Sequence, residues 1–162
     1  MNLIYLLIGG NVGDRIANLE TASDLIEQQI GKIIKRSSVY ETDAWGNPDQ
    51  PDFLNQVLFA ETGLSAIKCM GEIFSIENKM GRVRAKKNDP RIIDIDILIF
   101  NDEIINEPDL SIPHPQIQNR KFVLVPMNEL FPGLIHPVLK QSINNLLSAC
   151  NDQLEVRLLK HL

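Results

Sequence analysis

Two carboxylates, Asp94 and Asp96, stand two positions apart in a strongly apolar stretch at residues 92–100. If that stretch is a strand, its two-residue period places both carboxylates on one face. Two charges in such a strand are costly unless something compensates them. Magnesium fits this need, because it takes one or two protein carboxylates and completes its shell with water and substrate phosphates. Solvated acids at a strand end, or ion pairs with nearby arginines, are the alternatives.

Cations gather just before this acidic pair. Arg82, Arg84 and Arg91 lie within residues 81–91, and guanidinium groups match phosphate oxygens through paired hydrogen bonds. Phosphoryl transfer needs such groups beside metal ions, because its transition state calls mainly for positioning and neutralised charge. A solvated basic loop is the alternative, but its closeness to the paired carboxylates favours a phosphate site. No Walker-type glycine loop precedes a Lys-Ser or Lys-Thr pair, so any nucleotide is bound by another scheme.

A histidine is enclosed by two prolines in Pro113-His114-Pro115, and Arg120 follows shortly afterwards. The prolines restrict the backbone, which can aim the imidazole at a phosphate. A turn histidine without a chemical role is an equally good interpretation of this motif.

Aromatic residues and an amide occur at positions that can meet in space. Phe53, Asn55 and Phe122, together with the loop at 42–45, can form a flat slot with an amide at its edge. A planar heterocycle needs such a slot. From the residues alone, ordinary core packing remains the favoured interpretation of the aromatic pair.

The composition limits the class of protein. The chain has 162 residues, 44% of them apolar, which fits one domain spanning 1–162. Twenty-one acidic against sixteen basic residues give a formal charge of −5, the wrong sign for a protein that mainly grips nucleic acid. The apolar run at 3–8 is too short to span a membrane, and Cys69 and Cys150 lack metal-ligand spacing. We expect a cytoplasmic monomer that binds neither nucleic acid nor membrane.

Apolar periodicity predicts alternating strands and helices. Strands are expected at 3–8, 33–40, 53–61 and 92–100, and helices at 16–30, 65–79, 121–130 and after Ser142. Residues 41–52 form a long connection of the kind that often carries function, and Asn101-Asp102 suits a hairpin turn into Ile104-Ile105. This order predicts an α+β ferredoxin-like sandwich, an antiparallel sheet with helices on one side, plus an appended hairpin and C-terminal helices.

Taken together, these segments resemble the 6-hydroxymethyl-7,8-dihydropterin pyrophosphokinase family over nearly the whole chain. The most specific segment is Asp89-Pro90-Arg91-Ile92-Ile93-Asp94-Ile95-Asp96-Ile97, which is similar to the family's Pro-Arg-x-x-Asp-x-Asp block. The other matching segments, in the family's order, are Ile8-Gly9-Gly10-Asn11, Tyr40-Glu41-Thr42, Asp49-Gln50-Pro51-Asp52-Phe53-Leu54-Asn55, Glu77 with Gly81-Arg82-Val83-Arg84, Pro113-His114-Pro115, and Asn119-Arg120 with Phe122.

The resemblance implies a ferredoxin-like transferase that moves pyrophosphate as a unit from ATP to 6-hydroxymethyl-7,8-dihydropterin, releasing AMP, in folate biosynthesis. It implies two magnesium ions on Asp94 and Asp96, with Arg82 and Arg91 acting in the transition state. The residues that match ATP-binding positions are Glu77, Arg82, Arg84, Arg91, Ile97, His114 and Arg120. Those that match pterin-binding positions are Thr42, Asp43, Ala44, Trp45, Phe53, Asn55 and Phe122. A stacking role thereby replaces core packing as our expectation for the aromatic pair.

Some positions depart from the family pattern. Asp89 adds a negative charge where the family usually has a small residue, and the 85–88 stretch is slightly shorter and lacks a tryptophan that some relatives carry. Phe74 replaces a polar residue on the nucleotide side of its helix, and the position of Phe53 is often tyrosine.

Two other functions share the expected element order. An RNA-binding module would expose aromatics on its central strands and carry a basic surface, whereas this chain has the acidic pair there and a negative net charge. A regulatory small-molecule sensor would need neither the carboxylate pair nor the arginines.

Overall fold

The computed structural model describes residues 1–44, 49–82 and 89–160 of the chain. The elements are β1 (Asn2–Gly10), α1 (Arg15–Gln29), β2 (Gly31–Arg36), β3 (Tyr40–Thr42), β4 (Phe53–Thr62), α2 (Ala66–Lys79), β5 (Asp94–Phe100), β6 (Ile105–Glu107), β7 (Leu110–Ile112), the 3-10 helix η1 (Ile117–Asn119), α3 (Lys121–Leu130), α4 (Ile143–Ala149) and β8 (Val156–Leu158). Ser65 and Ser142 cap α2 and α4 with their side chains, as the sequence predicts.

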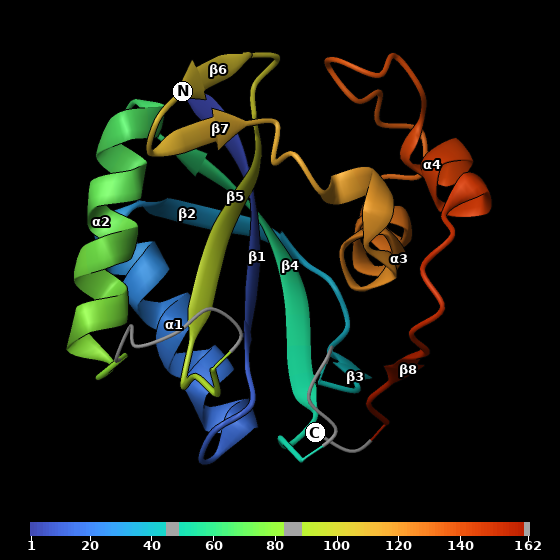
Figure 1. The fold of residues 1–162 in the computed structure, drawn as a ribbon. Coiled ribbons are helices and arrows are strands. Elements are labelled where there is room, and N and C mark those ends of the chain that lie inside the picture. The colour runs from blue at the N-terminus through green and yellow to red at the C-terminus, as the bar shows by residue number, and fades with distance from the viewer. Residues whose placement is uncertain (45–48, 83–88, 161–162) are drawn as a thin grey trace.

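The main sheet has the strand order β5-β1-β4-β3-β8, and β2 also pairs with β4 (Figure 1). Each of these pairings is antiparallel. The central strands β1 and β4 are long, and β5 forms an edge whose described backbone pairs with β1. The predicted ferredoxin-like α+β fold is confirmed, and the strand with the paired aspartates lies at the edge of the sheet.

The predicted single strand at 33–40 is wrong, because the structure divides it into β2 and β3. Arg36 pairs with Leu58 and Tyr40 pairs with Asn55, so one extra residue lies on the β2–β3 side. At this bulge the Ser37 hydroxyl accepts a hydrogen bond from the Val57 N–H at 2.9 Å, replacing a backbone partner. A serine hydroxyl that competes for backbone groups in this way interrupts a strand.

The appended hairpin is present but lies later than predicted. Asn101, with φ 49°, forms the expected turn after β5, and Glu103 N–H donates to Phe100 O at 3.0 Å. The chain then leaves the main sheet, and β6 pairs with β7 in a separate two-stranded sheet. β5 also begins at Asp94, later than the predicted residue 92. The sequence reading did not anticipate η1 and β8.

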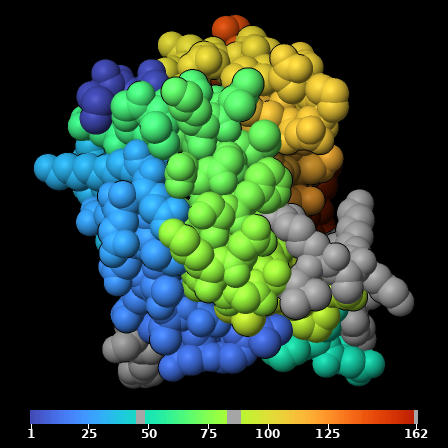
Figure 2. All heavy atoms as spheres, turned by 90° about the vertical axis from the view of Figure 1, so that its left-hand side faces the viewer, coloured from blue at the N-terminus to red at the C-terminus, as the bar shows by residue number. Residues whose placement is uncertain are grey.

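Helices cover both faces of the sheet, not one face as predicted. The face with Ile4, Leu6 and Ile8 packs on α1 and α2, which cover the side of the molecule seen in Figure 2. The face with Tyr5 and Leu7 packs on α3 and α4. The second layer arises because both faces of β1 are apolar, a pattern typical of a strand buried on both sides. Within the described ranges no helix combines the length and apolar character that a membrane span requires.

Gly10 allows two segments to cross at the end of β1. A β-carbon at this position would lie 2.2 Å from Ile92 O and 3.1 Å from Arg91 O. Both atoms belong to the backbone, which has little freedom to move aside. The glycine therefore lets the segment that carries Arg91 cross close to β1.

Gly10→Ala should lower the free energy of unfolding by about 1–3 kcal/mol, because the added methyl overpacks this crossing. The matched control is Gly71→Ala, since a β-carbon there meets nothing within 4 Å and Gly71 lies inside α2. That variant should gain about 0.5–1 kcal/mol through helix propensity. Urea denaturation of the three proteins measures both effects, and equal shifts in the same direction would contradict the packing argument.

Candidate active site

Three neighbouring strands place the site residues in two cross-strand rows. Gly9 of β1 pairs with Asn55 of β4 and with Asp94 of β5. The next row on this face consists of Val57, Leu7 and Asp96. A β-carbon on Gly9 would lie 2.3 Å from Asn55 Oδ1, so the missing side chain makes room for that amide. Ile95 and Ile97 belong to the core under α1 and α2, which agrees with the prediction that both aspartates share the other face.

Asp94 is held by Arg82 and Arg91, the two arginines for which the family resemblance implies a role in the transition state. Arg82 Nη1 lies 2.8 Å from Asp94 Oδ1, and Arg91 Nη1 lies 3.1 Å from Asp94 Oδ2. Arg82 Nη1 also lies 2.6 Å from Oε2 of Glu77, which is 1% exposed. The same Glu77 oxygen accepts a hydrogen bond from Ile95 N–H at 2.9 Å. Glu77 thus fixes the guanidinium of Arg82 and the backbone between the two aspartates.

Asp96 lacks the close ion pairs that hold Asp94 among the described residues. Burial raises the pKa of Asp96 to about 7, the charges of Asp94 and Glu77 add to the rise, and Arg120 and Arg82 oppose it. Among the described residues its carboxylate accepts no hydrogen bond from a protein donor. A carboxylate in such surroundings is stabilised by an added cation.

The donor set fits magnesium. Asp94 and Asp96 supply oxygen ligands beside a shared cavity wall, and the described residues contain no cluster of three or more acidic, histidine or cysteine side chains at metal-binding distance. Magnesium suits a site with one or two carboxylates, because phosphate oxygens and water complete its shell.

Two cavities meet at this acidic pair. The first, which we call the face cavity, measures about 360 Å³ and lies on the sheet face between β3, β4 and the start of α3. It is lined by Leu7, Thr42, Asp43, Gln50, Phe53, Asn55, Arg91, Asp94, Asp96, Gln116, Asn119, Arg120, Phe122, Asp152 and Leu154. The second, the edge cavity, measures about 320 Å³ and follows the outer edge of β5 against α2 and the β6–β7 hairpin. It is lined by Met70, Ile73, Phe74, Glu77, Arg82, Asp94, Ile95, Asp96, Ile97, Pro108, Asp109, Leu110, Ser111, His114 and Pro115.

The predicted site residues divide between the two cavities. The residues matched to the pterin that line the face cavity are Thr42, Asp43, Phe53, Asn55 and Phe122. Ala44 is described but does not line it. The residues matched to ATP that line the edge cavity are Glu77, Arg82, Ile97 and His114, whereas Arg91 and Arg120 line the face cavity. Trp45, Arg84 and the 85–88 stretch lie outside the described residues.

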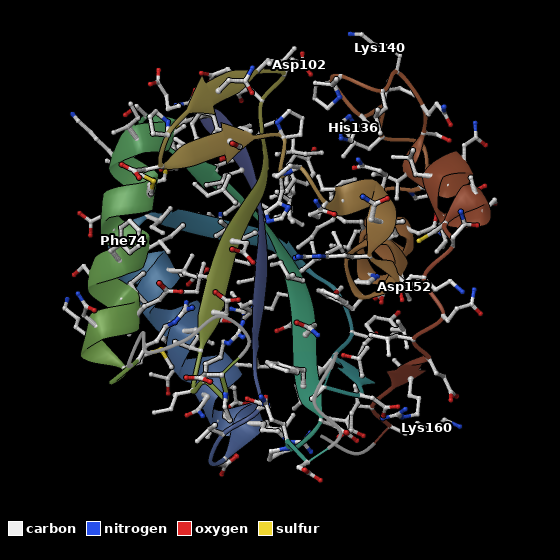
Figure 3. The ribbon with its side chains drawn as sticks, viewed as in Figure 1. Phe74, Asp102, His136, Lys140, Asp152 and Lys160 are labelled. Carbon is white, nitrogen blue, oxygen red and sulfur yellow. The ribbon has the colours of Figure 1, made fainter. Side chains whose placement is uncertain are left out.

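The aromatic residues Phe53 and Phe122 line the face cavity and are half-buried. The guanidinium of Arg91 lies 5.3 Å from the centroid of the Phe53 ring, and that of Arg120 lies 5.7 Å from the Phe122 ring. Each ring is therefore bounded by a cation that also faces Asp94 or Asp96. Phe74 lines the edge cavity from α2 and is 43% exposed; Figure 3 shows it on that helix.

His114 is neutral in this site. Burial lowers the pKa of His114 to about 4, and the charge of Arg120 acts in the same direction while Asp94 opposes it. Its Nδ1 accepts a hydrogen bond from Gln116 N–H at 3.1 Å, so the ring proton lies on Nε2. The His114 backbone N–H donates to Leu98 O at 2.8 Å and fixes this loop on β5. A neutral N–H donor is thus available across the physiological pH range.

Asn11 has a role that sequence reasoning missed. It is 1% exposed, and its Nδ2 donates to Gln50 Oε1 at 3.1 Å and to Pro51 O at 3.0 Å. Its Oδ1 accepts from Arg91 N–H at 2.9 Å. The residue therefore joins the loop before β4 to the segment carrying Arg91. The sequence signal for this role was its position in the family-like segment Ile8-Gly9-Gly10-Asn11. Asp152 and Leu154 also line the face cavity, but no sequence pattern indicated them.

The pKa of Asp96 predicts how stability depends on pH. Because the folded-state pKa is about 7 against an ordinary 3.8, the folded protein keeps a proton that the unfolded chain releases between these values. Without divalent metal, the free energy of unfolding should therefore decline as pH rises from 4 to 7. The contribution of a single group is at most about 1.4 kcal/mol per pH unit. Asp96→Asn should remove this decline in urea denaturation series.

The control for this measurement is Asp24→Asn, which removes an exposed carboxyl of α1 that lines neither cavity. Its profile should follow that of the wild type. Parallel profiles for wild type and Asp96→Asn would show that Asp96 ionises normally, against the burial argument.

Comparisons with known proteins agree with this geometry. The profile of the family described as 7,8-dihydro-6-hydroxymethylpterin-pyrophosphokinase (HPPK) matches residues 5–132. The chain is 41% identical over 143 residues to the 2-amino-4-hydroxy-6-hydroxymethyldihydropteridine pyrophosphokinase of Aquifex aeolicus, covering 88% of this chain and 89% of that protein. The Bacillus subtilis protein of the same name is 40% identical over 130 residues, covering 80% and 78%.

Longer proteins match as well. Folic acid synthesis protein fol1 of Schizosaccharomyces pombe is 36% identical over 93% of this chain, which spans 21% of that protein. The structure of wild-type Plasmodium falciparum HPPK-DHPS matches with a TM-score of 0.73 over 91% of this chain and 43% of that one, at 22% identity, a level that supports the fold. With a family match over most of its length and relatives near 40% identity, the chain belongs to the 7,8-dihydro-6-hydroxymethylpterin-pyrophosphokinase family.

Proposed function

We propose that this chain transfers a pyrophosphoryl group from ATP to 6-hydroxymethyl-7,8-dihydropterin, releasing AMP, as a step of folate biosynthesis. One structural observation supports the proposal independently of family membership. Two separate cavities share a wall formed by Asp94 and Asp96. This arrangement suits a two-substrate transfer, because donor and acceptor must approach each other beside the groups that neutralise charge.

The face cavity suits the pterin. Phe53 and Phe122 offer two ring faces, and the Asn55 amide can both donate to and accept from a heterocycle edge. Asn55 is 6% exposed, and its backbone pairs with Tyr40 and Gly9 across the sheet, so the strand fixes its place in the cavity wall before the ligand arrives. Thr42 and Asp43 close the same wall. With the ring held there, the hydroxymethyl group would point toward the aspartates.

The edge cavity suits ATP. Ile97 and Phe74 line this cavity from β5 and α2. The backbone at Ile97 would bind a planar base, and Phe74 would offer it an aromatic surface. A triphosphate that extends from this edge toward Asp94 would meet Arg82, and His114 would donate to it through Nε2–H. Arg91 and Arg120 would reach the phosphates from the face cavity. The aromatic Phe74 makes the base contacts of this chain differ from those of relatives with a polar residue.

Asp94 and Asp96 would hold the two magnesium ions that we propose as cofactors. When bound, these ions would neutralise phosphate charge and polarise the phosphorus that is attacked. Arg82 is held in place for the same purpose by the buried Glu77. A guanidinium fixed in advance stabilises developing charge without reorganising during the reaction.

In the transfer itself, the hydroxymethyl oxygen forms a bond to the β-phosphorus while the bond to the oxygen bridging the α- and β-phosphorus breaks. AMP leaves with that bridging oxygen, and the hydroxyl loses its proton as the new bond forms. The shared wall keeps attacking and leaving oxygens on opposite sides of the phosphorus, as an in-line displacement requires.

We further propose that residues 1–162 act as one unit, as a cytoplasmic monomer whose partners are these two small molecules. The formal charge of −5 supports this proposal, because it disfavours binding to nucleic acid and to anionic membranes.

Incubation of the protein with ATP, magnesium and the reduced pterin should yield AMP and the pterin pyrophosphate, which chromatography with mass detection can identify. Asp94→Asn and Asp96→Asn should each lower turnover by orders of magnitude, since each removes a charge from the shared wall. Asp102→Asn is the control, because Asp102 is exposed at the far end of β5 (Figure 3). Formation of ADP, or full activity in both variants, would contradict the proposal; a ligand-binding module without catalysis would form neither product.

Arg82→Ala and Arg91→Ala should lower kcat more than they weaken ATP binding, because contacts that strengthen in the transition state act on kcat. Arg36→Ala, which removes an exposed arginine of β2, is the control. Steady-state kinetics together with calorimetric titration of a non-hydrolysable ATP analogue separate the two effects. A loss confined to ATP affinity would assign both arginines to ground-state binding.

A further inference from the structure

The segment after α4 contributes to the face cavity, although it lies beyond the residues 5–132 that match the family profile. We call residues 151–158 the C-terminal strap. Asp152 and Leu154 of the strap line the face cavity, and its last residues form β8. Figure 1 shows the strap running from α4 past α3 to β3.

One end of the strap holds the start of α3. Asp152 Oδ2 accepts a hydrogen bond from the Lys121 N–H at 3.1 Å, and Oδ1 accepts from the Leu154 N–H at 3.0 Å. Arg120, at the N-cap position of α3, makes no capping bond with its own side chain. Asp152 therefore supplies the missing cap from a distant part of the chain. Figure 3 shows Asp152 beside α3, whose first turn carries Phe122.

The other end of the strap holds the opposite wall of the cavity. β8 pairs with β3, with Val156 opposite Thr42. Arg157 Nη2 lies 3.2 Å from Asp43 Oδ1 and 3.2 Å from Asp52 Oδ2. Thr42 and Asp43 line the face cavity, so the strap connects both sides of the ring slot.

The strap depends on these two ends because it gains little from core packing. A further hollow of about 550 Å³ borders Asn119, Asp152 and Leu154, which also line the face cavity. The middle of the strap is thus a thin wall between two hollows. A wall of this kind keeps its position through its anchors, and the Asp152 carboxylate is the anchor at α3.

We propose that the C-terminal strap sets the shape of the acceptor slot and thereby the affinity for the pterin. Asp152 is a positioning residue that fixes Phe122 and Arg120 relative to Phe53, and Leu154 forms an apolar side wall. The inference rests on the proposed function, since it takes the face cavity as the pterin site. It assigns no role to the strap in binding ATP, because the edge cavity contains none of its residues.

The test compares two carboxylate-to-amide changes in the strap of the full chain. Asp152→Asn keeps the size of the side chain but loses one of its two acceptor oxygens, and Glu155→Gln changes an exposed neighbour that lines neither cavity. Calorimetry measures the pterin Kd in the presence of magnesium and a non-hydrolysable ATP analogue, and separately the Kd of that analogue. Asp152→Asn should raise the pterin Kd tenfold or more and leave the nucleotide Kd within twofold, whereas Glu155→Gln should change neither.

Leu154→Ala gives a second variant that leaves the capping bonds in place, with Leu158→Ala, 49% exposed, as its control. It should raise the pterin Kd severalfold without changing the nucleotide Kd. Unchanged pterin affinity in both Asp152→Asn and Leu154→Ala, or an equal loss for both ligands, would overturn the inference alone. A wild-type protein that binds no pterin would overturn the proposed function and the inference together.

Discussion

Three carboxylates, Asp94, Asp96 and Glu77, face the same end of β5, and the remainder of the site compensates their charge. Arg82 joins Glu77 to Asp94 at 2.6 and 2.8 Å, and Arg91 reaches Asp94 at 3.1 Å. Asp96 forms no such ion pair among the described residues. Burial therefore raises its pKa with no close cation to offset the effect fully. The fold thus leaves one carboxylate whose charge an added cation would stabilise. The excess negative charge destabilises the empty site, and the same charge would hold the cations that neutralise phosphate groups during catalysis.

The position of β5 at the sheet edge makes this charge accessible from two directions. One side of the strand faces the sheet surface below α3, and its outer backbone edge faces α2 and the β6–β7 hairpin. An interior strand would have offered the aspartates to one cavity at most. Gly9 and Gly10 complete the arrangement from β1, because the first makes room for Asn55 and the second for the segment carrying Arg91. The edge strand therefore separates two cavities that share one pair of carboxylates.

Sequence reasoning predicted what depends on local pattern. The two-residue spacing of Asp94 and Asp96 predicted their common face, and serine caps predicted the starts of α2 and α4. The helix expected at 121–130, after the break at Pro113-His114-Pro115, is α3. It failed where distant partners decide the outcome. The Ser37 hydroxyl interrupts a strand by accepting a hydrogen bond from Val57 N–H. β8 forms by pairing with the edge of β3, which is far away in the sequence. Asn11 and Asp152 act through backbone groups far away in the chain, which no spacing rule records.

The claim that two substrates meet at one acidic wall is tested most directly by a crystal structure of the complex with magnesium, a non-hydrolysable ATP analogue and the reduced pterin. Our account predicts the base at the outer edge of β5, the pterin ring between Phe53 and Phe122, and both aspartates coordinating cations between them. It also predicts that the hydroxymethyl oxygen faces the β-phosphorus in line with the leaving oxygen. Nucleotide and pterin in a single cavity, or cations bound away from Asp94 and Asp96, would contradict it.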